Sequence, residues 1–203
     1  KHKSNVIKKT KRDFPDGIKE FGADALRFNF CAMASTGRDI NFDLKRIEGY
    51  RNFCNKIWNA SRFILLTCKD YQYNENLNSK DSNIFDKWIL YKLDNMVSDF
   101  KKYTTNYRFD LMANSIYDFV WNEYCDWYLE IAKNNINETT QNNLIFSIVR
   151  IIKICHPIIP FITEDIWKEF YNKGFVTEPM LINSSFPSQI RISKEYDVES
   201  RVE

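Results

Sequence analysis

The stretch from Asp43 to Lys69, DLKRIEGYRNFCNKIWNASRFILLTCK, carries the clearest structural pattern in the chain. Its apolar residues recur three and four positions apart, and its polar residues do so on the opposite side, as in an amphipathic helix that buries one face. Asp43 is the residue type that caps the free amides of a first helical turn. The stretch therefore predicts a long helix from Asp43 to about Lys69.

The same periodicity extends in both directions along the chain. No strand pattern is strong, and the polar, Asn-rich segment 71–83 lacks any periodicity and is expected to be a loop. The segment 110–135 has apolar residues on more than one face, so we expect it at the centre, with Asp110 as its cap. The fold class is an all-α helix bundle with an irregular C-terminal tail. The other predicted helices span 23–36, 84–103, 140–155 and 161–171.

Composition excludes several classes of protein. The net charge of the 203 residues is only +2, so any nucleic-acid binding must come from a local patch. The five cysteines are too far apart in the sequence for a zinc knuckle, and there are only two histidines, so we predict no metal site. No apolar run approaches the roughly 20 residues of a membrane span, and the cysteines favour a reducing, cytoplasmic environment.

A catalytic set is not apparent in the sequence. There is no glycine-rich phosphate loop and no combination of nucleophile and base that the sequence would bring together. Asp126 and Glu130 share a helix face, but we expect each to pair with an arginine or histidine of the bundle. His156 precedes Pro157, which ends a helix, and is expected to be a satisfied cap or core histidine.

The polar face of segment 43–69 is unusual because it contains no acid between Glu48 and Lys69. An ordinary exposed helix would mix both charges. Asparagine amides offer donors and acceptors that match base edges, lysine and arginine can meet phosphates, and an aromatic ring can stack on a base. A polar face that contacts a neighbouring domain is the alternative. The candidate RNA-contacting residues are Asn52, Asn55, Lys56, Asn59, Arg62 and Phe63.

Three stretches resemble the corresponding parts of bacterial valyl-tRNA synthetases. They are residues 21–66, WNEYCDWYLE at 121–130 and HPIIPFITEDIW at 156–167. GADALR and HPIIPFITE are similar, in looser form, to segments of the isoleucyl, leucyl and methionyl enzymes. The combination of STGRDINFD with RNFCNKIWNASRF resembles the valyl enzymes specifically.

The resemblance implies the anticodon-binding bundle of a class I aminoacyl-tRNA synthetase, which receives the anticodon loop of valine tRNA. It assigns five of these candidates, Asn55, Lys56, Asn59, Arg62 and Phe63, to that loop, with Phe63 as the stacking platform, and it assigns Arg38 and Asp39 to the inner corner of the tRNA. The full-length enzyme would be a valine-tRNA ligase that uses ATP and Mg²⁺. Neither the HIGH-type motif nor a complete KMSKS loop is present, so we expect no catalytic residue and no cofactor in this chain.

The resemblance also divides the chain. We expect residues 1–20 to be a connector from a catalytic domain, 21–43 a first helix and linker, 44–175 the anticodon-binding bundle, and 176–203 an extended tail toward a further region. The expected partners are valine tRNA and the catalytic domain of the same chain, with no membrane, in a monomer. The alternatives are the anticodon domain of an isoleucyl-type enzyme and a helical scaffold that binds only protein.

Overall fold

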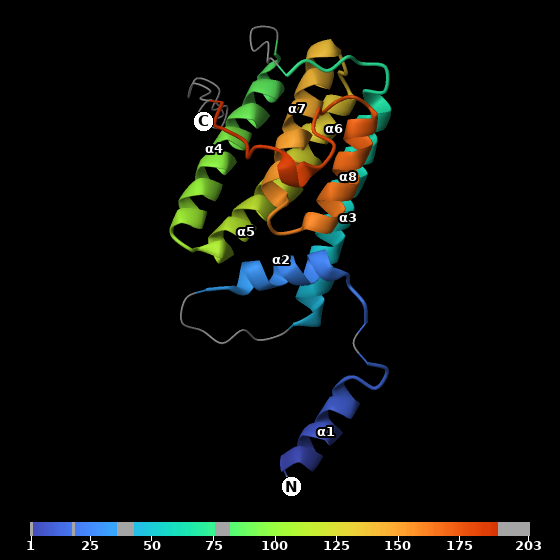
Figure 1. Ribbon diagram of the computed structural model, residues 1–203, viewed down its shortest axis with the longest axis vertical. Helices are drawn as coiled ribbons and strands as arrows, with labels where there is room; N and C mark the ends of the chain where they lie inside the picture. Colours follow the sequence, from blue (N-terminus) through green and yellow to red (C-terminus); the bar gives the residue numbers. More distant parts are fainter. Residues whose placement is uncertain (1, 18, 36–42, 76–81, 191–203) are drawn as a thin grey trace.

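The computed structural model describes residues 2–17, 19–35, 43–75 and 82–190, and within these ranges all regular structure is helical (Figure 1). The all-α prediction is confirmed for this part of the chain. The elements are α1 (His2–Asp13), α2 (Ala23–Met33), α3 (Leu44–Thr67), α4 (Ile84–Thr105), α5 (Phe109–Asp118), the π-helix η1 (Phe119–Tyr128), α6 (Leu129–Lys133), α7 (Glu138–Cys155), α8 (Pro160–Asn172) and the 3-10 helix η2 (Leu181–Asn183).

The long helices lie side by side as a bundle, and α2 crosses one of its ends (Figure 1). The tail after α8 runs back across the bundle. Helix α1 lies apart from the bundle, and its side chains from Lys3 to Arg12 are all exposed. The sequence predicts a connector here and not a helix, because the segment has no apolar face.

Helix α7 is the centre of the bundle, which corrects the expectation that segment 110–135 would be. Nearly every residue of α7 from Thr140 to Cys155 is buried, whereas η1 leaves Trp127 64% exposed. The run of Leu, Ile, Val and Phe in α7 buries all sides of that helix, so one-sided periodicity is weak there. The tryptophans and tyrosines of segment 110–135 include rings that remain at the surface.

Helix caps agree in part with the sequence. Asp43 caps α3 by accepting a hydrogen bond of 2.9 Å from the amide of Lys45, as predicted. The prediction that Asp110 is a cap was wrong, because Arg108 occupies that position. Asp110 instead lies in the first turn of α5, where both its oxygens accept from the Arg108 guanidinium, at 2.8 and 2.7 Å. This ion pair lowers the pKa of Asp110.

Segment 110–135 was predicted as one helix and is divided into α5, η1 and α6. A π-helix differs from an α-helix by about one residue per turn, which a short hydrophobic pattern cannot resolve. Two buried tyrosines anchor η1: Tyr124 donates to the carbonyl of Leu144 at 3.2 Å, and Tyr128 donates to Asp86 at 2.7 Å. The carboxylate of Asp86 also accepts from Thr140 at 3.3 Å, so α4, η1 and α7 meet at one buried polar centre.

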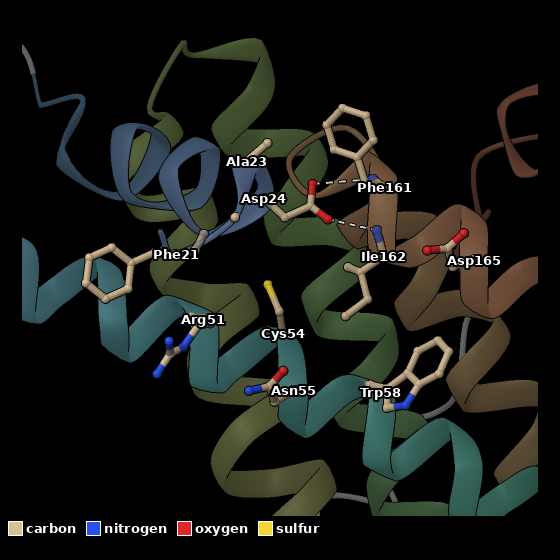
Figure 2. A pocket seen from close by; sticks show the side chains of 12 residues that line it. Phe21, Ala23, Asp24, Arg51, Cys54, Asn55, Trp58, Phe161, Ile162 and Asp165 are labelled. Atoms are coloured by element: carbon tan, nitrogen blue, oxygen red, sulfur yellow. Dashed lines mark hydrogen bonds between the residues drawn. The ribbon is translucent and has the colours of Figure 1, made fainter. Parts of the chain in front are cut away.

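Two side chains of α2 fasten it to the turn between α7 and α8. The carboxylate of Asp24 accepts from the backbone amides of Phe161 and Ile162, at 3.3 and 2.7 Å (Figure 2). Arg27 donates to the carbonyls of Ile158 and Pro157, at 2.8 and 3.0 Å. GADALR and HPIIPF, far apart in the sequence, are thus in direct contact.

Candidate functional site

Four of the six predicted site residues form an exposed stripe along α3. The side chains of Asn52, Asn55, Asn59 and Arg62 are all exposed, one helical turn after another. None of the four makes a hydrogen bond or ion pair with the described part of the chain. The geometry therefore presents three amides and one guanidinium whose donors and acceptors are open to a partner. We call these four residues the α3 stripe.

Lys56 and Phe63 lie differently, at the edge where α3 packs against η1 and α6. The Lys56 ammonium donates to the carboxylate of Asp126 and lies 4.0 Å from the ring centroid of Trp121. The ammonium of Lys133 lies 5.5 Å from the centroid of Phe63. Both predicted residues are half-buried and already have neighbours within the bundle.

The acidic residues of this edge have lysine partners. Asp126 pairs with Lys56, and Glu130 accepts from Lys133. The expectation of an arginine or histidine partner was wrong, although the structural role was right. Arg38 and Asp39, predicted for the inner corner of a tRNA, lie outside the described residues.

A cavity of about 550 Å³ adjoins the α3 stripe at Asn55, between α2, α3 and α8 (Figure 2). Its walls include the aromatic ring of Trp58 and the charged groups of Arg51 and Asp165. The Arg51 guanidinium lies 3.4 Å from a Glu48 carboxylate oxygen and 5.6 Å from the ring centroid of Phe21. Sequence reasoning missed this cavity because three separate elements create it by packing.

Three buried cysteines of the bundle carry thiols rather than thiolates. Burial raises the pKa of Cys54, Cys68 and Cys125 to about 12, so these thiols are protonated near neutral pH. Over the described ranges there is no group of three or more His, Cys, Asp or Glu side chains that could hold a metal ion. In the same part of the chain, no helix is both long enough and apolar enough to span a membrane.

His156 has a structural place. Its Nδ1 lies 2.9 Å from the Thr163 hydroxyl, and Glu164 lies 3.9 Å from its Nε2. The Thr163 hydroxyl also donates a hydrogen bond to the carbonyl of Ile159 at 2.8 Å. Burial lowers the pKa of His156, and the nearby acids oppose that shift. The prediction of a satisfied histidine is confirmed.

Comparison with known proteins identifies the family. Residues 86–203 match the model of the anticodon-binding domain of tRNA ligases. The chain belongs to this family. Its anticodon-binding fold is also found in a solved LeuRS–tRNA–LeuAMS complex from Agrobacterium radiobacter K84, with a TM-score of 0.67 over 89% of this chain and 21% of that one. The two sequences are 15% identical, so this similarity shows the fold alone.

Curated relatives of this anticodon-binding domain are valine–tRNA ligases. The Legionella pneumophila (strain Lens) enzyme is 46% identical over 176 residues, which cover 82% of this chain and 19% of the relative. The Francisella tularensis enzyme is 46% identical over 194 residues, covering 91% and 21%, and the Dechloromonas aromatica enzyme is 40% identical over 221 residues, covering 100% and 23%. The chain thus spans about a fifth of the length of these relatives.

Proposed function

We propose that this anticodon-binding domain belongs to a valine–tRNA ligase and receives the anticodon loop of valine tRNA. The observation that carries the proposal is the identity of 46% over 176 residues with a valine–tRNA ligase. In this proposal the whole enzyme joins valine to its tRNA with ATP and Mg²⁺, in the cytoplasm and as a monomer. No residue of this chain is assigned to those cofactors.

The domain organisation belongs to the same proposal. Residues 1–20 connect to a catalytic domain, 21–43 lead into the bundle, 44–175 bind the anticodon, and 176–203 extend toward a further region. The reaction and the reading of the tRNA then take place on separate domains. Helix α3, with 24 residues, is about 36 Å long and can carry a binding site well away from the chemistry.

The α3 stripe is proposed as the surface that meets the RNA. An amide that faces the wrong base leaves donors or acceptors unpaired, which costs about 1–3 kcal/mol per buried group and so supplies discrimination. Arg62 is a guanidinium without a carboxylate partner in the described part of the chain, and it is suited to a phosphate or a base acceptor.

The other predicted residues keep a role in the proposal. Lys56 sits at the edge of the stripe, where its bond to Asp126 leaves the ammonium with further donors for RNA. Phe63 supports the same edge beneath Lys133. Arg38 and Asp39 are proposed to face the inner corner of the tRNA.

A titration with anticodon stem-loops tests the proposal. We expect the valine stem-loop to bind at low salt more tightly than the isoleucine stem-loop, and Asn59→Ala and Arg62→Ala to weaken binding. Lys101→Ala, which removes an exposed cation from α4, is the matched control and should leave the affinity unchanged. Preference for the isoleucine loop would favour the isoleucyl alternative. Absence of binding to both loops would leave a protein-binding scaffold as the better description.

A further inference from the structure

Trp127 is the one tryptophan of this chain that the fold leaves at the surface. Its side chain is 64% exposed, whereas Trp167 is 1% exposed and the other three are half-buried. A single exposed apolar residue is common on any protein, so exposure alone carries no conclusion. The surroundings of Trp127 are what distinguish it.

The backbone that carries Trp127 is anchored by two buried tyrosines. Trp127 lies near the end of the π-helix η1, between Tyr124 and Tyr128, whose rings are fully buried and whose hydroxyls are bonded to Leu144 and Asp86. π-Helical turns recur at functional sites. An exposed indole on such an anchored segment is a flat surface at a fixed backbone position, so little backbone freedom is lost when a partner binds it.

The carboxylates beside Trp127 each have a lysine partner. Asp126 precedes it and is paired with Lys56, and Glu130 follows within one turn and is paired with Lys133. Both carboxylates are therefore offset by cations of the edge between α3, η1 and α6. The same two lysines can turn toward phosphates around a base that rests on the indole.

Phe63 is less suited to stacking than the sequence suggested. It is half-buried, and the Lys133 ammonium lies 5.5 Å from its ring centroid, so one face of the ring is engaged within the protein. Of the two rings, Trp127 is the more exposed and has the larger stacking area. Trp127 also lies within residues 86–203, the part of the chain that matches the anticodon-binding family.

We propose that Trp127, rather than Phe63, is the platform on which an unpaired base of the bound RNA loop stacks. This inference rests on the proposed function, since it names a second contact of the same RNA. Single-stranded RNA is held by such combinations of aromatic surface and cations. The RNA loop then spans from the α3 stripe across the Lys56–Asp126 contact to η1.

The test combines binding with two fluorescence signals. The valine anticodon stem-loop is titrated against the chain and against Trp127→Leu, Trp127→Phe, Phe63→Leu and the control Tyr107→Leu, which removes another exposed aromatic ring. Tryptophan emission reports a base that stacks on Trp127, and 2-aminopurine placed singly at each loop position reports which base stacks. The melting temperature of each variant shows that it is folded.

We expect Trp127→Leu to weaken binding roughly 5- to 150-fold, the range for loss of one base–aromatic stack. Trp127→Phe should retain most of the affinity while the RNA-dependent quenching of tryptophan emission decreases, because only Trp58 and Trp121 then remain beside the proposed RNA surface. Tyr107→Leu should bind as the parent chain does, and Phe63→Leu should lose less affinity than Trp127→Leu does. Equal affinity of Trp127→Leu and the parent chain, or quenching that is undiminished in Trp127→Phe, would overturn this inference but leave the proposed function standing. Absence of binding by the parent chain would remove both.

Discussion

The ammonium of Lys56 on α3 donates a hydrogen bond to the carboxylate of Asp126 on η1 and lies over the ring of Trp121. A lysine that the sequence assigned to RNA is thus also a tie between two helices. Its side chain is 24% exposed and that of Asp126 is 49% exposed, so water screens the pair. The contact orients the edge of the candidate site more than it stabilises the bundle.

A double-mutant cycle should measure this tie. We expect Lys56→Met and Asp126→Asn, alone and together, to give a coupling of about 0.2–1 kcal/mol in urea unfolding, the usual range for exposed ion pairs. Lys56→Met should weaken RNA binding, whereas Asp126→Asn frees the ammonium and should strengthen binding at low salt. A weaker complex with Asp126→Asn would indicate that the ion pair itself is what the RNA requires.

The buried centre around Asp86 should be sensitive to loss of one hydroxyl. Tyr128→Phe removes the 2.7 Å donor to a carboxylate that is 1% exposed. Leaving a buried group less well satisfied costs about 1–3 kcal/mol, so the free energy of unfolding should fall by that amount. Tyr91→Phe on α4 is the control, because the half-buried Tyr91 makes no hydrogen bond with the described residues. A change of similar size in both variants would contradict a specific role for Asp86.

The stability of the bundle should depend on pH through His156. Burial is the main cause of its lowered pKa, and Glu164 and Asp24 raise that pKa only in part. Below the ordinary pKa of about 6.5 the unfolded chain binds a proton that the folded chain resists. The free energy of unfolding should therefore fall as pH decreases from 7.5 to 5.5. Urea unfolding of His156→Gln should show a shallower decrease, and an unchanged slope would exclude His156 as its source.

The fold could be predicted largely from the sequence, because most helices carry one-sided apolar patterns and clear end signals. Helix α3 was expected from Asp43 to about Lys69 and spans Leu44–Thr67. Helix α8 begins at Pro160, one residue before the predicted start, and the missing amide proton of this proline is not needed there. Helix α1 was not predicted because it has no buried face. The π-helix η1 was predicted as part of an α-helix because its hydrophobic pattern resembles that of an α-helix.

The candidate site was predictable only in its exposed part. The spacing of the polar residues in α3 is enough to predict one outward face. That face carries Asn52, Asn55, Asn59 and Arg62. Other polar residues of α3 have hydrogen-bond partners in distant segments of the chain. Lys56, for example, pairs with Asp126, 70 residues later. Long-range pairings of this kind leave no periodic pattern in one sequence. The cavity beside Asn55 likewise forms where segments far apart in the sequence pack together.

The contact between GADALR and HPIIPF yields a further prediction about stability. Asp24 is 8% exposed, and its two oxygens accept from the first free amides of α8, where a negative charge also meets the positive end of the helix. In Asp24→Asn one side-chain oxygen can still accept a hydrogen bond. The side-chain amide group that replaces the other oxygen is a donor, and it faces a backbone amide that is also a donor. We expect it to lower the free energy of unfolding by about 0.5–2 kcal/mol, as for loss of a helix cap, and to loosen α2 from the bundle.

The control is Asp165→Asn, which removes an exposed charge from α8, the helix that Asp24 caps. Hydrogen exchange should show faster opening of α2 amides in Asp24→Asn only, and equal protection in both variants would mean that the Asp24 hydrogen bonds do not hold α2 in place.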